Sequence, residues 1–145
     1  MNNSSIIYLK KIAFYIVLGT CSIQAMNHNH EHQEKIDFKL FCACLCGTIK
    51  QIESAIIKGA NVNTIPQGCY ETPLMLAVKR GDTNMVSALL QLKANPNSVN
   101  SLTGKTALHN AYKNQHYLIA KVLESRGADK RIKDLYGKTP LEYKK

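Results

Sequence analysis

The chain has 145 residues, which is enough for one ordinary domain and leaves little room for a second. It has no Trp and few other aromatic residues, so its core must be built from aliphatic and small side chains. Its net charge of +9 favours acidic proteins, anionic surfaces or nucleic acid as partners and does not choose among them.

Residues 1–25 are typical of a signal peptide. Lys10 and Lys11 precede an apolar run of about ten residues, about half the length that a membrane-spanning helix needs. Cleavage after Ala25 would leave roughly 120 residues with a net charge of about +7. Two alternatives stay open: residues 18–21 resemble a bacterial lipobox that would place a lipid anchor on Cys21, and the segment could instead be a helix of the core. We therefore expect export to the periplasm or secretion, and a bacterial source.

Residues 26–36 are predicted to be a polar, His-rich linker. His28, His30 and His32 alternate along it, and neutral imidazole is a common ligand for zinc, copper and nickel. An exported metal-handling protein that uses these three histidines is thus an alternative function. A disordered polar tail without metal is the simpler interpretation, and we favour it.

Residues 37–145 contain a repeat of about 34 residues, the distance that separates two matching runs. Thr-Pro-Leu-Met-Leu-Ala at residues 72–77 corresponds to Thr-Ala-Leu-His-Asn-Ala at residues 106–111. Gly-Ala-Asn at residues 59–61 returns as Lys-Ala-Asn at 93–95 and as Gly-Ala-Asp at 127–129. This register predicts units at about 37–69, 70–103 and 104–136, followed by a partial unit at 137–145.

Each unit is predicted to contain two short helices and a loop. Thr72 is suited to cap the first helix of the second unit, and Pro73 fits its first position. Apolar residues then recur at spacings of three and four, and Gly81 marks the turn to the second helix. A polar stretch with a glycine follows each second helix and is suited to a hairpin.

Several residues depart from this pattern. Lys93 stands where the other units have the glycine that ends the second helix, and a left-handed conformation there would cost roughly 1 kcal/mol. Tyr112 replaces a small residue and Gln115 replaces the turn glycine of the third unit. Gln51 occupies an apolar position of the first unit, as expected of a terminal unit that faces water.

These runs resemble the ankyrin repeat. The match is carried by residues 59–63 (Gly-Ala-Asn-Val-Asn), 72–74 (Thr-Pro-Leu), 104–106 (Gly-Lys-Thr), 108–109 (Leu-His), 127–129 and 134–141. The resemblance implies an all-α solenoid of helix-turn-helix units with hairpin loops, about three units plus a truncated C-terminal cap. It also implies a non-catalytic, monomeric protein-binding module that needs no cofactor and is not expected to bind nucleic acid.

The resemblance further implies that the hairpin tips and the exposed side of the first helices contact the partner. Five of these thirteen positions are basic and one is acidic, which predicts an acidic partner surface and binding that weakens with salt. For any single lysine, a solvated surface is the simpler interpretation. The hairpin positions are Tyr70, Glu71, Leu102, Thr103, Lys105, Tyr136 and Lys138, and the first-helix positions are Leu76, Lys79, Arg80, Asn110, Lys113 and Asn114.

The cysteines and histidines of the repeat are predicted to be structural. Cys42, Cys44 and Cys46 fall in the first helix, with Cys44 at an interior position, so we do not expect a structural zinc site there. With Cys69 they form an even set that allows three full pairings in an oxidising compartment, and reduced or partly paired thiols are equally acceptable. His109 matches the family histidine that links neighbouring units by hydrogen bonds. No catalytic pairing or phosphate-binding loop is evident, so we do not expect an enzyme.

Overall fold

The computed structural model describes the backbone of residues 28–66 and 68–144, and the side chains of residues 32–144 except for Cys46 and Gln67. Residues 1–25, with the predicted cleavage site and Cys21, lie outside the described residues. His32–Lys145 form one compact unit, which is described here by itself.

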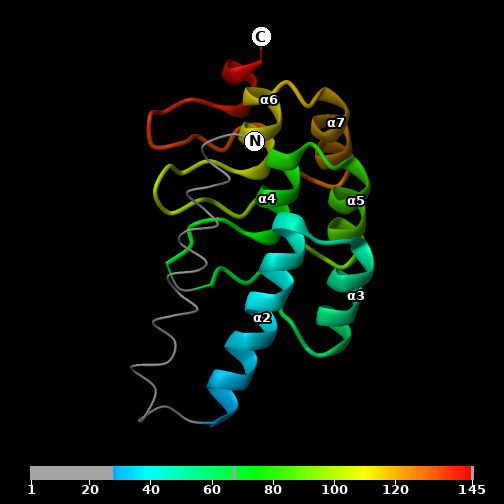
Figure 1. The fold of residues 1–145 in the computed structure, drawn as a ribbon. Coiled ribbons are helices and arrows are strands. Elements are labelled where there is room, and N and C mark those ends of the chain that lie inside the picture. Colours follow the sequence, from blue (N-terminus) through cyan, green and yellow to red (C-terminus); the bar gives the residue numbers. More distant parts are fainter. Residues whose placement is uncertain (1–27, 67, 145) are drawn as a thin grey trace. The chain divides into compact units, whose positions relative to one another are not determined.

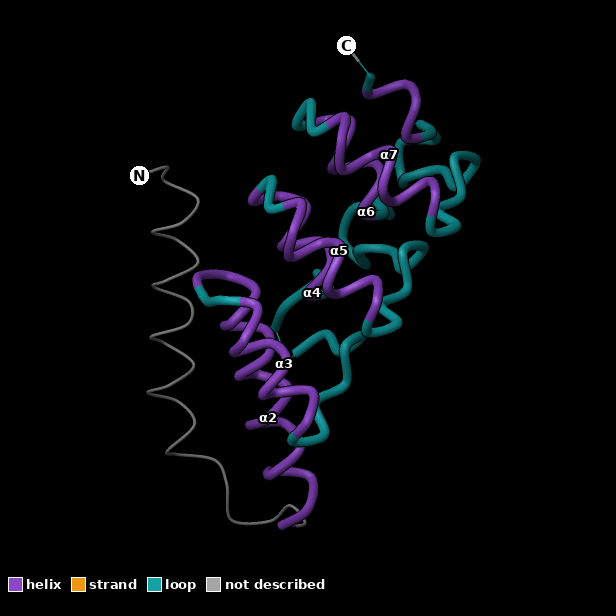
Figure 2. Tube along the Cα trace, turned by 90° about the vertical axis from the view of Figure 1, so that its right-hand side faces the viewer, coloured by secondary structure: helices purple, strands orange, loops and turns teal. Residues whose placement is uncertain are grey.

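The described regular structure is helical, which confirms the predicted all-α repeat architecture. The helices follow one another as pairs, α2 with α3, α4 with α5 and α6 with α7, and successive pairs lie side by side as layers (Figures 1 and 2). Loops project to one side between the layers (Figure 1). The elements are α2 (His28–Cys46), α3 (Ile49–Ile57), α4 (Pro73–Arg80), α5 (Thr83–Gln91), α6 (Ala107–Lys113), α7 (Tyr117–Ser125) and the 3-10 helix η1 (Pro140–Tyr143).

The ends of α4 and α5 follow from their capping residues, as the sequence predicts. Thr72 accepts a hydrogen bond from the backbone N–H of Met75 over 3.3 Å, and Pro73 occupies the first turn, where no donor is needed. Gly81 ends α4 in the left-handed conformation, with φ of 73°. Asp82 then caps α5 by accepting from Met85 N–H over 2.9 Å.

The core runs continuously through all three units and consists mainly of aliphatic side chains, as the lack of Trp requires. Ala77 and Ala111 are fully buried, since a larger side chain would separate the two helices of each unit. Six of the eight residues of α4 are buried, because this helix packs against α5 and α6 and its last residue, Arg80, binds Cys44 of the first unit. The first helices therefore expose much less surface than the second ones.

Lys93 and Gln115 are the non-glycine residues with positive φ in the described part of the chain, at 69° and 62°. Lys93 shares the left-handed conformation of the glycines at 59 and 127, whose φ values are 95° and 87°, so the cost considered for that case applies. Gln115 occupies the place that Gly81 has in the second unit. Both positions thus retain a backbone conformation suited to glycine after the glycine has been lost.

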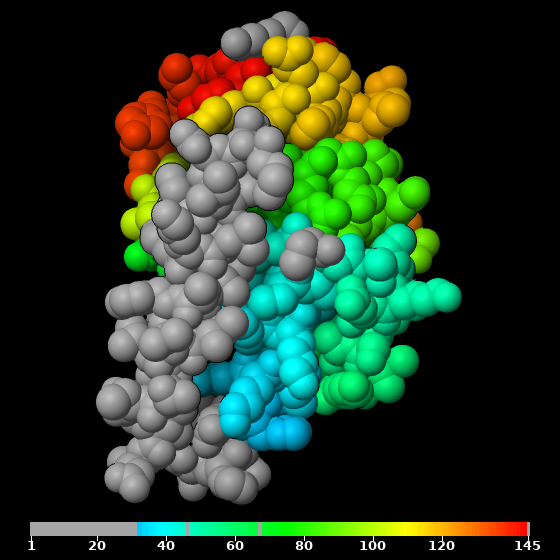
Figure 3. All heavy atoms as spheres, in the orientation of Figure 1, coloured from blue at the N-terminus to red at the C-terminus, as the bar shows by residue number. Residues whose placement is uncertain are grey.

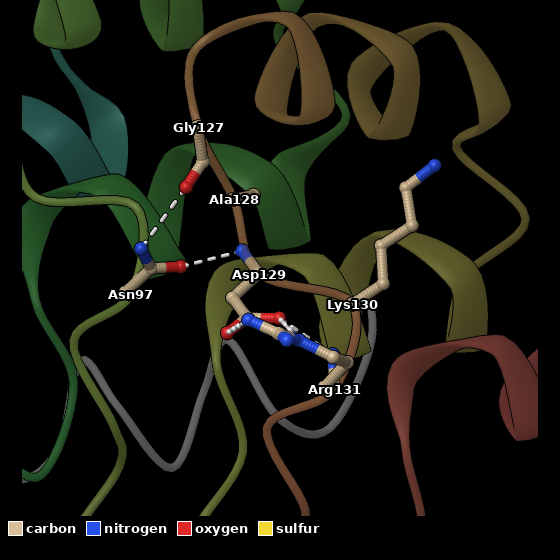
Figure 4. A pocket seen from close by; sticks show the side chains of 6 residues that line it. All are labelled: Asn97, Gly127, Ala128, Asp129, Lys130 and Arg131. Carbon is tan, nitrogen blue, oxygen red and sulfur yellow. Dashed lines mark hydrogen bonds and ion pairs between the residues drawn. The ribbon is translucent and has the colours of Figure 1, made fainter.

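A ladder of side-chain hydrogen bonds links each unit to the next. Asn97 donates from Nδ2 to the Gly127 carbonyl over 3.0 Å and accepts from Asp129 N–H over 2.8 Å (Figure 4). One unit earlier, Asn63 binds the corresponding backbone groups of residues 93 and 95 over 3.3 and 2.7 Å. Each asparagine thereby pairs one backbone carbonyl and one backbone N–H group in the loop that follows the second helix of the next unit.

Helix α2 supplies the same two bonds to the first unit and corrects the prediction for residues 26–36. Gln33 donates to the Gly59 carbonyl over 2.9 Å, and Asp37 accepts from Asn61 N–H over 2.8 Å and from the Thr64 hydroxyl over 3.1 Å. Residues 28–36 are helical, whereas the sequence predicts a linker or disordered tail. Gln33 of this segment binds a loop 26 residues away, a contact that the local sequence does not reveal.

None of the helices in the described ranges is long and apolar enough to cross a membrane.

Candidate interaction surface

Two hairpins have the same construction: the second hairpin (residues 98–106) and the third hairpin (residues 132–139), named after the units that they follow. Asn100 N–H donates to the Lys105 carbonyl and Asp134 N–H to the Lys138 carbonyl, each over 2.9 Å. Inside each turn, the Asn100 or Asp134 side chain accepts two backbone N–H groups over 2.9–3.1 Å. These local bonds hold both turns in a fixed shape before any partner binds.

The two hairpins also bind each other. Leu135 N–H donates to the Thr103 carbonyl over 3.0 Å, and a Cβ added to Gly104 would lie 2.7 Å from Leu135 N. Only glycine allows this approach, and its φ of 68° is also one that other residues rarely adopt. The glycine of the Gly-Lys-Thr run therefore serves hairpin packing.

The predicted hairpin positions differ in exposure. Tyr70, Leu102 and Tyr136 are exposed by 41%, 59% and 77%, and Lys138 is exposed as well. Thr103 is half-buried. Tyr70, Leu102 and Tyr136 keep large apolar surfaces in water at the loop ends, where a partner could cover them.

Glu71 is placed differently from the prediction, because it is buried and not on a tip. Its carboxylate forms an ion pair with Lys79 and accepts from Asn100 Nδ2 over 3.3 Å. These contacts join the second unit to the second hairpin. The one acidic residue of the predicted surface therefore has a structural role, and its ion pair also involves the Lys79 ammonium.

Leu76 and Asn110 are buried too, with 3% and 6% of their surface exposed, although the sequence places them on the groove side. Lys105 is largely covered: its Nζ lies 3.9 Å from the Asp134 carboxylate and 4.2 Å from the centre of the Tyr143 ring. These three residues support the stack and are unavailable to a partner.

The remaining first-helix positions are exposed. Lys113 and Asn114 lie at the end of α6, and Lys79 keeps 39% of its side chain in solvent. Arg80 is exposed but donates from Nη1 to the Cys44 carbonyl over 3.0 Å, which ties it to the first unit. Of the first-helix cations, Lys113 forms no ion pair within the described residues.

Most carboxylates of the fold interact with groups of the protein itself, and this affects the charge that the surface presents. Of the nine Asp and Glu residues between 32 and 144, eight take part in a hydrogen bond, an ion pair or another electrostatic interaction. Exposed lysines such as Lys113 and Lys133 have no such ion pair in residues 32–144. The protein therefore presents positive charge to its surroundings. The eight carboxylates are Glu34, Asp37, Glu71, Asp82, Glu124, Asp129, Asp134 and Glu142.

His109 links two units, as predicted. Its Nδ1 accepts from Thr106 N–H over 3.0 Å, so Nε2 carries the proton and donates to the Lys138 carbonyl over 3.1 Å. Burial is the main cause that lowers the pKa of His109 below its usual value. The neutral ring satisfies both neighbours, which leaves no free nitrogen for acid-base chemistry.

Among the described cysteines, Cys44 has the surroundings of an unreactive thiol. Cys44 is a free, fully buried thiol, and burial raises its pKa to about 12. Full pairing of the four cysteines therefore does not occur in this structure. Cys42 and Cys69 are half-buried, and the Cys46 side chain lies outside the described residues.

The predicted metal ligands are only partly described. His32 is exposed, whereas the side chains of His28 and His30 lie outside the described residues. Within the described part of the chain, no group of three His, Cys, Asp or Glu side chains is placed to hold a metal ion.

An open depression of about 560 Å³ lies beside the last rung of the ladder (Figure 4). Lys130 and Arg131 border it together with Asn97 and residues 127–129. The Arg131 guanidinium points back to Asp129, with Nε 3.1 Å from Oδ1. The charged groups around the depression are already in ion pairs or hydrogen-bonded to backbone. These residues therefore connect two units, and we do not assign a ligand site to the depression.

Sequence reasoning missed two surface residues. Leu135 is 69% exposed at the third hairpin, and Lys133 is exposed beside it. The run Lys-Asp-Leu-Tyr-Gly-Lys at residues 133–138 contains the signal, since an apolar pair stands where turns usually carry polar residues.

Comparison with known proteins agrees with this geometry. The family model described as ankyrin repeats in three copies matches residues 40–134. The chain belongs to the ankyrin-repeat family. Ankyrin repeats bind protein partners and are typically non-enzymatic, which supports the general function expected from the sequence.

Its relatives are animal proteins. The chain is 35% identical over 97 residues to the BRCA1-associated RING domain protein 1 of Caenorhabditis elegans, covering 67% of this chain and 14% of that protein. It is 34% identical over 86 residues to a putative palmitoyltransferase ZDHHC13 of Danio rerio, covering 59% and 13%. The chain thus spans about a seventh of these relatives. They lend no support to the predicted bacterial source.

Among solved structures, the crystal structure of the ankyrin repeat domain of Bcl-3, a member of the IkappaB protein family, is similar. The TM-score is 0.70 with 27% identity, over 73% of this chain and 46% of that one.

Proposed function

We propose that this ankyrin module binds a protein with an acidic surface, using its hairpin tips and the exposed ends of its first helices. The observation that carries the proposal is the distribution of charge. Most of the described carboxylates are hydrogen-bonded or ion-paired within the fold, whereas Lys113 and Lys138 extend into solvent on the two parts of the surface without an ion pair among residues 32–144. Charge of one sign on a preformed surface speeds association with a partner of the opposite sign.

Glu71, Leu76, Lys105 and Asn110 are left out of this surface because the fold uses them. Lys79 is also a poor reporter, since its reversal would place two carboxylates together at a nearly buried site. The remaining surface consists of Tyr70, Leu102, Tyr136, Lys138, Arg80, Lys113 and Asn114, with the half-buried Thr103 and with Lys79 at its edge.

The test compares the full chain with the double variant Lys113→Glu/Lys138→Glu in affinity capture from the source organism, followed by a binding measurement with each recovered protein. The control is Lys50→Glu/Lys121→Glu, which makes the same charge change on exposed positions of the second helices. We expect the first variant to lose binding, the control to keep it, and added salt to weaken it. Equal binding by both variants, or binding that ignores salt, would contradict the proposal.

Export through residues 1–25 is part of the proposal and is supported by Lys10, Lys11 and the apolar run that follows. Intact-mass spectrometry of the protein recovered outside the cell should find a chain that begins at Met26. A lipid on Cys21 would indicate anchoring instead. Recovery of the full 145 residues only from the cytoplasm would refute export.

A further inference from the structure

The second and third hairpins together form a surface whose composition differs from the rest of the molecule. Their ends lie next to each other at the left of Figures 1 and 3, in yellow-green and orange-red. Leu102, Leu135 and Tyr136 expose 59%, 69% and 77% of their surface there. With Lys133 and Lys138 on the same turn as Tyr136, these five residues are called the tip patch.

The tip patch is rigid before binding. The Leu135–Thr103 hydrogen bond of 3.0 Å and the close contact at Gly104 fix the hairpins to each other. The Asp134 carboxylate also accepts from the Tyr143 hydroxyl over 2.6 Å, which ties the third hairpin to η1. A surface held in this way loses little conformational entropy when it binds, so burial of its apolar side chains is realised largely as affinity.

The charge of the tip patch has one sign. Asp134 is the single carboxylate among residues 98–106 and 132–139, and it is buried. Lys133 and Lys138 are exposed, and the exposed carboxylate of Glu142, just beyond the third hairpin, interacts with both at longer range. The patch keeps a net positive charge next to large apolar side chains, and this combination fits a partner that offers apolar side chains next to carboxylates.

The first hairpin does not share this composition. Its residues 64–70 contain no lysine or arginine, and Gly68 stands at the position of Leu102 and Tyr136. The patch is therefore a property of the second and third hairpins and not of the repeat in general.

We propose that the tip patch is the specificity site of the module and binds a partner segment in which large apolar side chains alternate with Asp or Glu. This inference rests on the proposed function and narrows it to one part of the surface and one partner chemistry.

The test selects binders for the immobilised full chain from a display library of random 12-residue peptides. The enriched peptides should combine Leu, Phe or Tyr with Asp or Glu. Leu102→Ser and Tyr136→Ser should each weaken binding of these peptides by at least about 10-fold, and Lys133→Glu/Lys138→Glu should weaken it similarly. The matched controls are Leu118→Ser and Lys121→Glu, which alter exposed positions of α7. Circular dichroism checks that each variant is folded.

Three results would overturn the inference: enriched peptides without acidic residues, unchanged affinity in Leu102→Ser and Tyr136→Ser, or no peptide with a Kd below about 100 μM. If Leu102→Ser and Tyr136→Ser keep full affinity for the partner while Lys113→Glu loses it, the assignment of specificity to the tip patch is wrong and the proposed function stands. If neither set of variants affects the partner or the peptides, both fall.

Discussion

Lys93→Gly should stabilise the protein although it removes a side chain. Lys93 has φ of 69°, and its side chain is exposed. Relief of the left-handed conformation is worth roughly 1–2 kcal/mol, from which the greater freedom of glycine in the unfolded chain subtracts about 0.5–1 kcal/mol. The net gain is therefore about 0.5–1 kcal/mol, which corresponds to a rise in melting temperature of roughly 2–6 °C for a domain of this size.

The reverse change provides the control. A Cβ at Gly127 would meet no atom within 4 Å, so Gly127→Ala adds backbone strain without a clash and should destabilise by about 1 kcal/mol. Urea unfolding followed by circular dichroism gives both free energies, and the slope with denaturant should stay unchanged. If Lys93→Gly destabilises the protein, or if Gly127→Ala has no effect, the argument from φ is wrong.

Three further perturbations address individual contacts. Asn97→Ala removes both bonds of one ladder rung and should lower the free energy of unfolding by about 1–2 kcal/mol, measured by urea unfolding; a change near zero would show that water replaces the rung. Because the folded pKa of His109 lies below the unfolded value of about 6.5, the unfolded chain binds the extra proton, so stability is fully present above pH 6.5 and declines as the pH falls below it. His109→Gln should reduce this decline between pH 7 and 5, and identical pH profiles would refute the assignment. Tyr112→Phe removes the 2.6 Å bond that is the main cause of the lowered pKa of Glu124, so NMR titration should find that pKa raised, and no change would contradict the contact.

The residues that set the backbone could be predicted from the sequence because their effects are local. Thr72, Gly81 and Lys93 act on their own turn, and a period of 34 residues carries each conclusion to the next unit. The loop conformation at residue 93 was predictable from the glycines at 59 and 127 for the same reason. Comparison of repeated units thus indicates a loop conformation that the sequence of one loop alone does not predict.

The burial of the surface residues was less predictable. Leu76 and Asn110 were expected to face a groove, yet short helices enclosed on several sides have few solvent-facing positions, and the spacing of apolar residues does not identify them. Glu71 is on a predicted tip by position, but the Asn100 amide of the second hairpin and the Lys79 ammonium of α4 both bind its carboxylate, which lies inside the fold. In the helix that includes residues 28–36, Gln33 and Asp37 bind a distant loop. Such contacts exist only after the chain has folded.

The ladder also has a bearing on how this chain could change in length. Every rung joins an asparagine side chain of one unit to backbone groups of the next unit. The asparagine therefore needs no particular side chain in the next unit. Excision of residues 64–97 as a block would bring Asn63 into the place of Asn97, facing the same carbonyl and N–H groups. Gene duplication or loss of whole units can thus proceed without a compensating substitution at this seam, while an insertion of any other length would break it.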